Sequence, residues 1–447
     1  MPSLEALRPA PRFVTPLLFA LSIIAFALPV ALYWFMIGRA PSITPREAMR
    51  RLAAEPARAL LVDVRAPASF RREHLDGANN WPSAEIRRLD SPAEIPQRFR
   101  GTKLLLLSQN GIASAEAALK LRSLGIADAD SVKDGMCGWI ASAVGGSGGV
   151  GSFCRLLDAA GKARDLNPRR SSLFEQWTAV ATGFILKPIH MALTFALIIW
   201  LWRRRSPDLG ALRWGMTAFF AGESACAANY LVWHNQSPLA EYLHSFGMVI
   251  GFGFAAYAMI EAADTRLLHF SDQERRCAFD LCGPCFKFAD AACGLRRVFL
   301  ILIPAVMVVG AMPFTAAPEA SCYNTVILGT PYNYCHAVIY QIFEARFFPG
   351  YGLALLMASF FALLLQPRIG LAPSKVFFAA GLGPLGFGLL RFVLFRAYQH
   401  DLVWFAFWEE MTEFLFVIGA AFVVWAFRTR LAAEAAKDAG TSAGQAA

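Results

Sequence analysis

The chain of 447 residues has room for two or three domains, and 56% of its residues are hydrophobic. A mean hydropathy of +0.43 excludes an ordinary soluble enzyme. The formal net charge of +9 does not indicate nucleic acid, because the basic residues flank apolar runs, where cytoplasmic loops of membrane proteins collect lysine and arginine. We therefore expect a multidomain, polytopic α-helical membrane protein whose partner is the lipid bilayer, with no nucleic acid.

The first apolar run covers residues 13–37 and follows a short N-terminus, residues 1–12, that contains Arg8 and Arg12. A signal peptide has a shorter apolar core, about 7–15 residues, and a small-residue cleavage site. We therefore predict an uncleaved membrane anchor.

Residues 38–142 form the one sizeable polar domain. A helix is expected over 44–54, with Thr44 as N-cap and Pro45 at the first helical position. Strands are expected over 60–64 and 103–107, and a further helix over 114–124. Strands that alternate with helices predict a small parallel α/β sheet.

Three sequence blocks lie along this domain: LLVDVRAPASFRREHLDGANNWP at 60–82, LLLLSQNGIAS at 104–114 and LGIADADSVKDGMCGW at 124–139. In order and spacing they resemble the rhodanese-like, or sulfurtransferase-like, family. The resemblance implies that fold, with structural positions filled by Asp63, Arg65, Phe70, His74, Gly77, Ala78, Pro82, Gly135 and Trp139.

The middle block resembles the family's active-site loop, whose first residue is a cysteine that carries a persulfide. Here that residue is Ser108, whose hydroxyl neither ionises near neutral pH nor forms an S–S bond. Ala113 stands where the family commonly has an arginine. We predict that sulfurtransferase turnover is lost, that Ser108 hydrogen-bonds within the loop, and that the backbone amides still favour a small anion or sulfur compound. The degenerate loop comprises Ser108, Gln109, Asn110, Gly111, Ile112, Ala113 and Ser114.

Residues 143–176 are expected to be a flexible linker, because they contain the glycine-rich stretch 145–151. Seven further apolar runs follow, which with the anchor predict about eight transmembrane helices, and residues 428–447 form a tail. The seven-helix bundle spans 177–427, with runs at 177–202, 212–233, 242–262, 298–314, 347–365, 375–398 and 402–427.

Charge predicts the orientation. If the N-terminus is inside, the short outer connections contain only Arg346, and the other basic residues near the runs lie inside. We therefore predict a bacterial-type inner membrane protein with both termini in the cytoplasm and the rhodanese-like domain outside.

The inner connection, 263–297, is rich in cysteine. Its spacing fits zinc or an iron–sulfur cluster, a redox dithiol or free thiols, and these alternatives stay open; the residues are Cys277, Cys282, Cys285 and Cys293. In the outer connection, Cys322 and Cys335 are expected to form a disulfide, because that compartment is oxidising.

Ionisable residues inside apolar runs are functional candidates. Counting along the helices from the connecting turns places Lys187 and Glu223 within about 6 Å in depth, and Arg391 and Glu409 at equal depth. We predict both pairs, with His190 beside the first, and Glu410, Glu413 and Arg396 extending the second. Two interpretations of these charged residues stay open. They form pairs that fix the registry of the helices, or they line a pathway for a substrate, a proton or an anion. His234 and His244 fall at the outer ends of adjacent runs, where they could ligate a haem, but the sequence has no haem attachment motif.

Two functions follow. In the first, an inactive rhodanese-like domain outside the membrane binds or senses a small anion or sulfur compound for a bundle that transports or signals. In the second, a membrane redox or sulfurtransferase enzyme uses the four-cysteine loop as a metal, iron–sulfur or dithiol site.

Overall fold

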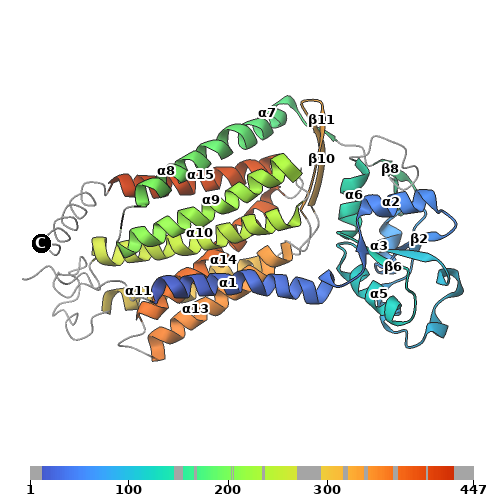
Figure 1. The fold of residues 1–447 in the computed structure, drawn as a ribbon, viewed down its shortest axis with the longest axis horizontal. Helices are drawn as coiled ribbons and strands as arrows, with labels where there is room; N and C mark the ends of the chain where they lie inside the picture. Colours follow the sequence, from blue (N-terminus) through green and yellow to red (C-terminus); the bar gives the residue numbers. More distant parts are fainter. Residues whose placement is uncertain are drawn as a thin grey trace, which may run out of the picture.

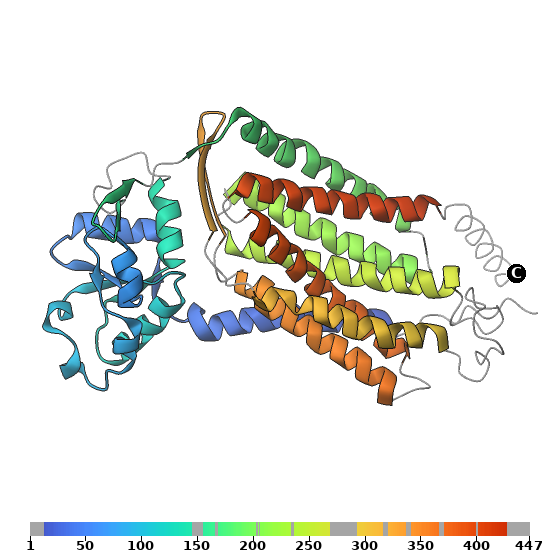
Figure 2. The same ribbon diagram turned by 180° about the vertical axis from the view of Figure 1, so that it is seen from behind.

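The computed structural model describes residues 13–144, 155–165, 169–202, 204, 206–233, 237–268, 293–315, 321–336, 341–365, 371–398 and 401–426. The molecule is elongated, with an α/β domain at one end and a helix bundle at the other (Figure 1). The N-terminal end of helix α1 (Val14–Tyr33) and the C-terminal end of helix α15 (Leu402–Ala426) both point toward the end of the bundle that lies away from the α/β domain (Figure 2).

The α/β domain is built on a five-stranded parallel sheet in the order β1-β6-β5-β2-β4. Helices cover both of its faces, as a parallel sheet requires. The strands are β1 (Ser42–Ile43), β2 (Ala59–Asp63), β4 (Asn79–Asn80), β5 (Lys103–Leu107) and β6 (Ala129–Val132), and the helices are α2 (Pro45–Ala54), α3 (Pro67–Arg72), α4 (Ser83–Arg87), α5 (Ile112–Ser123), α6 (Gly135–Val144) and the 3₁₀ turns Pro92–Glu94 and Gln97–Phe99.

The leucines of the central strand β5 divide between two hydrophobic cores. Leu104 and Leu106 pack in one core with residues of α4 and α5, and Leu105 and Leu107 pack in the other with residues of α2 and α6. Successive side chains of a strand point to opposite faces, so a strand covered on both sides is apolar throughout. Because both faces of β5 are covered, the carboxyl end of this strand and the start of the loop after Leu107 are buried in the domain.

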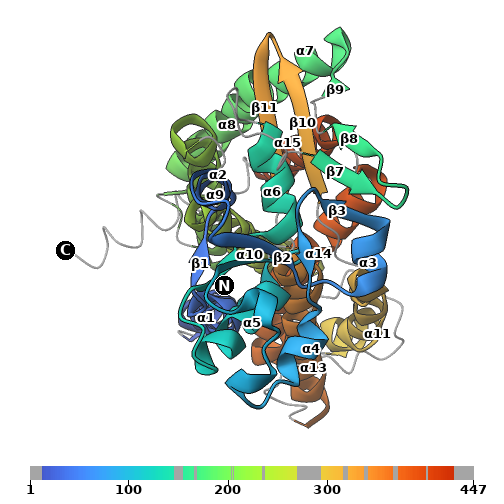
Figure 3. The ribbon, with the colours of Figure 1, turned by 90° about the vertical axis from the view of Figure 1, so that its right-hand side faces the viewer.

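The expected flexible linker over 143–176 contains strands. In a second sheet, β7 (Arg155–Asp158) pairs with β3 (Glu73–Leu75) and with β8 (Ala163–Asp165). In a third sheet, β9 (Arg169–Arg170) pairs with β10 (Ser321–Ile327), which forms a hairpin with β11 (Thr330–His336). This hairpin lies beside α6, as the view from the α/β end shows (Figure 3). Leu156, 2% exposed, packs in the core of the α/β domain, and this burial orders the segment.

Among the described residues, the bundle contains six helices, or continuous helical segments, that are long and apolar enough to cross a membrane. Two further long helices, α9 and α15, lie among them and carry buried acidic residues (Figure 1). The expected count of about eight membrane helices is therefore not confirmed. The bundle elements are α1, η1 (Trp34–Gly38), α7 (Leu173–Ala181), η5 (Thr182–Leu186), α8 (Lys187–Leu201), α9 (Pro207–Trp233), α10 (Pro238–Ala262), η6 (Ala263–Leu268), α11 (Cys293–Gly310), η8 (Met312–Thr315), η9 (Phe343–Phe347), α13 (Phe348–Leu365), α14 (Leu371–Tyr398) and α15.

Helices α9 and α10 touch through glycine. A Cβ atom at Gly247 would lie 2.6 Å from Gly222 Cα and 2.7 Å from Ala218 O. About two turns along the same contact, a Cβ at Gly215 would lie 3.0 Å from Gly251 O. Small residues of this kind let helix backbones approach closely in membranes. The contact fixes the relative position of the side chains next to these glycines.

Candidate functional site

The loop 108–114 leaves the carboxyl end of β5 and leads into α5. Gly111 has φ 83°, a left-handed conformation that glycine adopts without strain. A Cβ at Gly135 would lie 2.2 Å from Ser108 O, so only glycine fits where the next segment crosses the loop. The loop is tightly enclosed by its own domain.

Side chains of the loop accept hydrogen bonds from some of its backbone N–H groups. Gly111 N–H donates to Ser108 Oγ at 2.9 Å, and Ile112 N–H donates to Asn110 Oδ1 at 3.2 Å. Ser114 Oγ lies 3.2 Å from Ser108 Oγ and 2.8 Å from Ser131 Oγ. Ser108 is 2% exposed. Two amide donors that would face an anion are therefore already occupied.

The residues beside the loop serve the fold. Asp63, fully buried, accepts hydrogen bonds from the backbone N–H and the guanidinium of Arg65. Arg65 also donates to Gln109 Oε1 at 3.0 Å, which ties this side chain to the loop. The His74 ring lies 2.9 Å from Phe70 O through Nδ1 and stacks on Phe70. Trp139 is fully buried, and Gly77 has φ 76°.

The loop end of the α/β domain faces the bundle. A cavity of about 290 Å³ separates Ile112, the first residue of α5, from η9 and from the end of α1 nearest the α/β domain. Beside it, Asp134 interacts electrostatically with Tyr33, and partial desolvation by the surrounding protein raises the pKa of the Asp134 carboxyl although its side chain keeps solvent contact. The cavity is lined by Leu32, Tyr33, Ile112, Ile342, Phe343, Arg346 and Phe347.

A larger hollow of about 510 Å³ lies at the opposite end of the sheet, where Gly101 and Thr102 precede β5 and Asp128 precedes β6. Ligands of open parallel sheets bind at the carboxyl ends of the strands. This hollow therefore adds nothing to the loop's chemistry.

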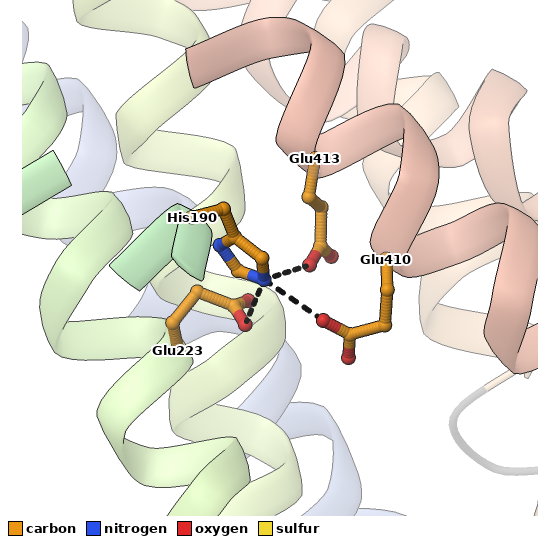
Figure 4. Close-up of side chains that lie close together, drawn as sticks. All are labelled: His190, Glu223, Glu410 and Glu413. Atoms are coloured by element: carbon orange, nitrogen blue, oxygen red, sulfur yellow. Dashed lines mark hydrogen bonds and ion pairs between the residues drawn. The ribbon is translucent and has the colours of Figure 1, made fainter. Parts of the chain in front are cut away.

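The bundle encloses a second cluster of polar residues, entirely separate in sequence. Lys187 Nζ lies 2.5 Å from Glu223 Oε2 and 2.5 Å from Glu410 Oε1. His190 Nε2 lies 2.9 Å from Glu410 Oε2 and 3.8 Å from Glu413 Oε2. Figure 4 shows the side chains of α8, α9 and α15 converging on one point.

The cluster continues toward α10, α14 and η9. His244 Nδ1 lies 3.3 Å from Glu223 Oε1, and His244 Nε2 lies 3.9 Å from Glu409 Oε1. Arg391 lies between two glutamates: its Nη1 is 2.7 Å from Glu409 Oε1, and its Nε is 3.3 Å from Glu344 Oε1. We call the residues Lys187, His190, Glu223, His244, Glu344, Arg391, Glu409, Glu410 and Glu413 the bundle centre.

Sequence reasoning treated this region as two separate pairs, Lys187 with Glu223 and Arg391 with Glu409. The structure joins them, because Lys187 also contacts Glu410 on α15. It adds Glu344, which sequence reasoning passed over, and His244, which it grouped with His234. Arg396 is exposed on α14 and makes no contact with the centre in the interactions described. Sequence reasoning missed Glu344 because it lies three residues before the expected apolar run 347–365, and a glutamate so close to that run was the available signal.

The far end of the bundle carries charges of a different kind. Lys375 pairs with Glu261 at 2.9 Å and with Asp264, and Arg266 Nε lies 2.6 Å from Asp208 Oδ2. These acidic groups each have a cation beside them. The bundle centre, by contrast, holds more carboxylates than cations.

The cysteine predictions lie largely outside the described residues. Cys277, Cys282 and Cys285 are not among them, and Cys293 is described only as the first residue of α11. The β-hairpin sets Cys322 opposite Cys335, while their side chains are outside the described part, so the disulfide stays a prediction. His234 also lies outside the described residues.

Comparisons with known proteins bear on the α/β domain. Residues 44–142 match the family described as rhodanese-like domain. Over 102 residues the chain is 31% identical to the probable adenylyltransferase/sulfurtransferase MoeZ of two Mycobacterium tuberculosis strains, CDC 1551 and H37Rv; the match covers 23% of this chain and 25% of each relative. The chain thus spans about a quarter of the length of these relatives.

A solved structure from Rhodopseudomonas palustris, described as a protein of unknown function and possible tyrosine phosphatase, aligns with 16% identity over 32% of this chain and 96% of its own. Its TM-score is 0.21, too low to establish a shared fold. The rhodanese-like assignment of residues 44–142 is confirmed, and the helix bundle is assigned to no family by these matches.

Proposed function

We propose that this chain is an integral membrane protein that acts at the bundle centre, and that its rhodanese-like domain is a non-catalytic cap on the outer end of the bundle. One observation carries this proposal. The short element η9 supplies Phe343, Arg346 and Phe347 to the cavity beneath the loop and Glu344 to the bundle centre. A change at the cap interface therefore has a direct physical route to the buried charges.

The cap's role is regulation of transport or signalling by the bundle. Its loop lacks a thiol, two loop amides are bonded internally, and the surface over the loop is turned to the bundle. An anion or sulfur compound that binds at the cap would act by shifting the cap against η9. We propose that α9 and α15 also cross the membrane, which gives eight crossings, with both termini in the cytoplasm and the cap outside, as the basic residues favour.

Ile112→Asp tests the coupling. The cavity is lined by apolar and aromatic side chains apart from Arg346, whose guanidinium donates to Pro313 O. A carboxylate at position 112 is therefore unfavourable unless the cap withdraws, and we expect hydrogen exchange of the 341–347 backbone amides to rise several-fold in the full-length protein. Glu116→Gln, an exposed position on the same helix α5, is the matched control and leaves exchange unchanged. Unchanged exchange in Ile112→Asp, with the cap still folded, would contradict the coupling.

Ser108→Cys tests the loss of catalysis. We expect no transfer of sulfur from thiosulfate to cyanide, because the new thiol is enclosed within the loop and lacks a neighbouring cation at Ala113. Mass spectrometry after incubation with thiosulfate checks the same point independently. A stable gain of one sulfur atom on the introduced thiol, with turnover, would show that only the nucleophile had been lost.

The second function, a membrane redox or sulfurtransferase enzyme that uses Cys277, Cys282, Cys285 and Cys293, rests on residues outside the described part of the chain. It requires zinc or iron bound by thiolates. Replacement of these cysteines by serine separates such thiolate-bound metal from metal held elsewhere.

A further inference from the structure

The bundle centre contains two groups of side chains with the donors of a metal site. His190, Glu223, Glu410 and Glu413 form one group, and His244, Glu409 and Glu413 form the other. Within each group, one donor atom from every residue lies within 4.8 Å of the others. Ligands of one metal ion, each about 2.0–2.2 Å from it, lie about 3–4 Å apart, so a small inward movement brings each group to coordination distance.

Glu413 belongs to both groups, and its own surroundings point to a missing ligand. Its side chain is 1% exposed, and neither carboxylate oxygen has a hydrogen-bond partner. A buried carboxylate without a donor is strongly unfavourable. A cation in each of the two groups would satisfy both oxygens, one on each side.

Both histidines direct a ring nitrogen toward carboxylates of the bundle centre. His190 Nε2 points at Glu223, Glu410 and Glu413 (Figure 4). His244 Nε2 lies on the side of Glu409, while its Nδ1 faces Glu223 Oε1. A carboxylate at the other ring nitrogen supports a metal-binding histidine, because it fixes the tautomer and the ring. His244 has such a carboxylate in Glu223, whereas His190 Nδ1 has no hydrogen-bond partner among the described residues.

Charge favours more than one cation. Arg391 offsets Glu344, which leaves the carboxylates of Glu223, Glu409, Glu410 and Glu413 against the single ammonium of Lys187. Such an excess of negative charge inside a low-dielectric bundle is costly. Two divalent ions change the formal charge of these five side chains from −3 to +1, whereas in the far-end cluster each carboxylate already has Lys375 or Arg266 beside it.

We propose that His190, Glu223, His244, Glu409, Glu410 and Glu413 bind a pair of divalent transition-metal ions bridged by Glu413. The donor set of carboxylates and imidazoles, without thiolates, suits Fe²⁺, Mn²⁺ or Zn²⁺. Four glutamates and two histidines from facing helices are also the donors of dinuclear sites in soluble helix bundles. The Glu-x-x-His pattern of those sites occurs once here, as Glu241 with His244, although Glu241 is in neither donor group. Lys187 positions Glu223 and Glu410 and is not itself a ligand.

The test is the metal content of the full-length protein purified in detergent without chelator, from medium that contains iron, manganese and zinc. All four cysteines of the inner connection are replaced by serine, which removes thiolate-bound metal. We expect about two metal ions per chain. One ion per chain would overturn the pair, and none would overturn the site and leave protons as the neutralising cations.

Two variants assign the ions to these residues. Glu413→Gln keeps the shape of the bridging side chain and is expected to lose both ions, with gel filtration as the check on folding. Glu261→Gln, another glutamate of the bundle that pairs with a lysine, is the matched control and keeps both. If Glu413→Gln kept both, or Glu261→Gln lost them equally, the assignment would be wrong. Titration of the metal-free parent protein with Co²⁺, followed by its visible absorption, gives the stoichiometry even where a variant misfolds.

The proposal does not depend on the role of the cap. Ile112→Asp is expected to keep both ions even where it raises exchange in η9. If Ile112→Asp kept both ions but left the hydrogen exchange of η9 unchanged, only the proposed regulation would be rejected. If it raised the exchange and the parent protein bound no metal, only the metal pair would be rejected.

Discussion

Replacing Arg391 by methionine is expected to lower the free energy of unfolding by about 3–5 kcal/mol, because it leaves buried carboxylates without their cation. Arg391 is 2% exposed and contacts Glu344 and Glu409. Its guanidinium also lies over the rings of Phe387 and Phe405, with 5.1 and 5.5 Å to the ring centroids. Unfolding in detergent, followed by far-ultraviolet circular dichroism at increasing SDS, measures the loss.

Two further variants show what the arginine supplies. Arg391→Lys keeps the charge but not the planar fork that bridges two carboxylates, so it is expected to restore only part of the stability. Arg396→Met removes an exposed arginine from the same helix α14 and is expected to change stability by less than about 0.5 kcal/mol. An equal loss in Arg391→Met and Arg396→Met would mean that the buried contacts contribute nothing.

Replacing Gly247 by valine is expected to force α9 and α10 apart and to lower the free energy of unfolding by about 3 kcal/mol or more. The new side chain would meet the backbone of Gly222 and Ala218, which cannot rotate away. Gly419→Val in α15 is the matched control, because a Cβ there has nothing within 4 Å. The same unfolding measurement applies to both.

Gly247→Val also acts on the bundle centre. Gly222 precedes Glu223, and Gly247 lies about one helical turn after His244, so separation of the helices moves a carboxylate and an imidazole together. We expect the variant to lose metal even in the fraction that remains folded. Full metal content in a well-folded Gly247→Val protein would show that the glycine contact does not position the centre.

The sequence predicted the α/β domain well, because its signals are local. Strand β5 is a run of leucines, α2 has its cap at Thr44, and the blocks that surround Asp63, Ser108 and Trp139 identify the family. It failed for the segment after the domain, where β7 gains its order from Leu156 in the domain core. A four-residue strand with one buried leucine has no distinctive pattern of its own.

For the bundle centre, counting residues along two helical hairpins put Lys187 at the depth of Glu223 and Arg391 at the depth of Glu409. Depth says nothing about which hairpins are neighbours. Contact between α8 and α15 brings Lys187 to Glu410, and contact between η9 and α14 brings Glu344 to Arg391. Both are tertiary contacts between segments distant in the sequence, and the same acidic residues keep α9 and α15 out of the set of plainly apolar helices.

The chain enters the cap from α1 and leaves it through β9 into α7, and β9 also pairs with β10, so the cap is attached to the bundle at both of its ends. A domain held at both ends close to its docking surface has an effective concentration there of the order of millimolar. Detachment is thus opposed by rapid intramolecular rebinding, and a soluble copy of the domain at micromolar concentration would compete poorly. Regulation by the cap, as proposed above, would therefore act through small movements of a docked domain and not through its release, whatever the amount of protein in the membrane.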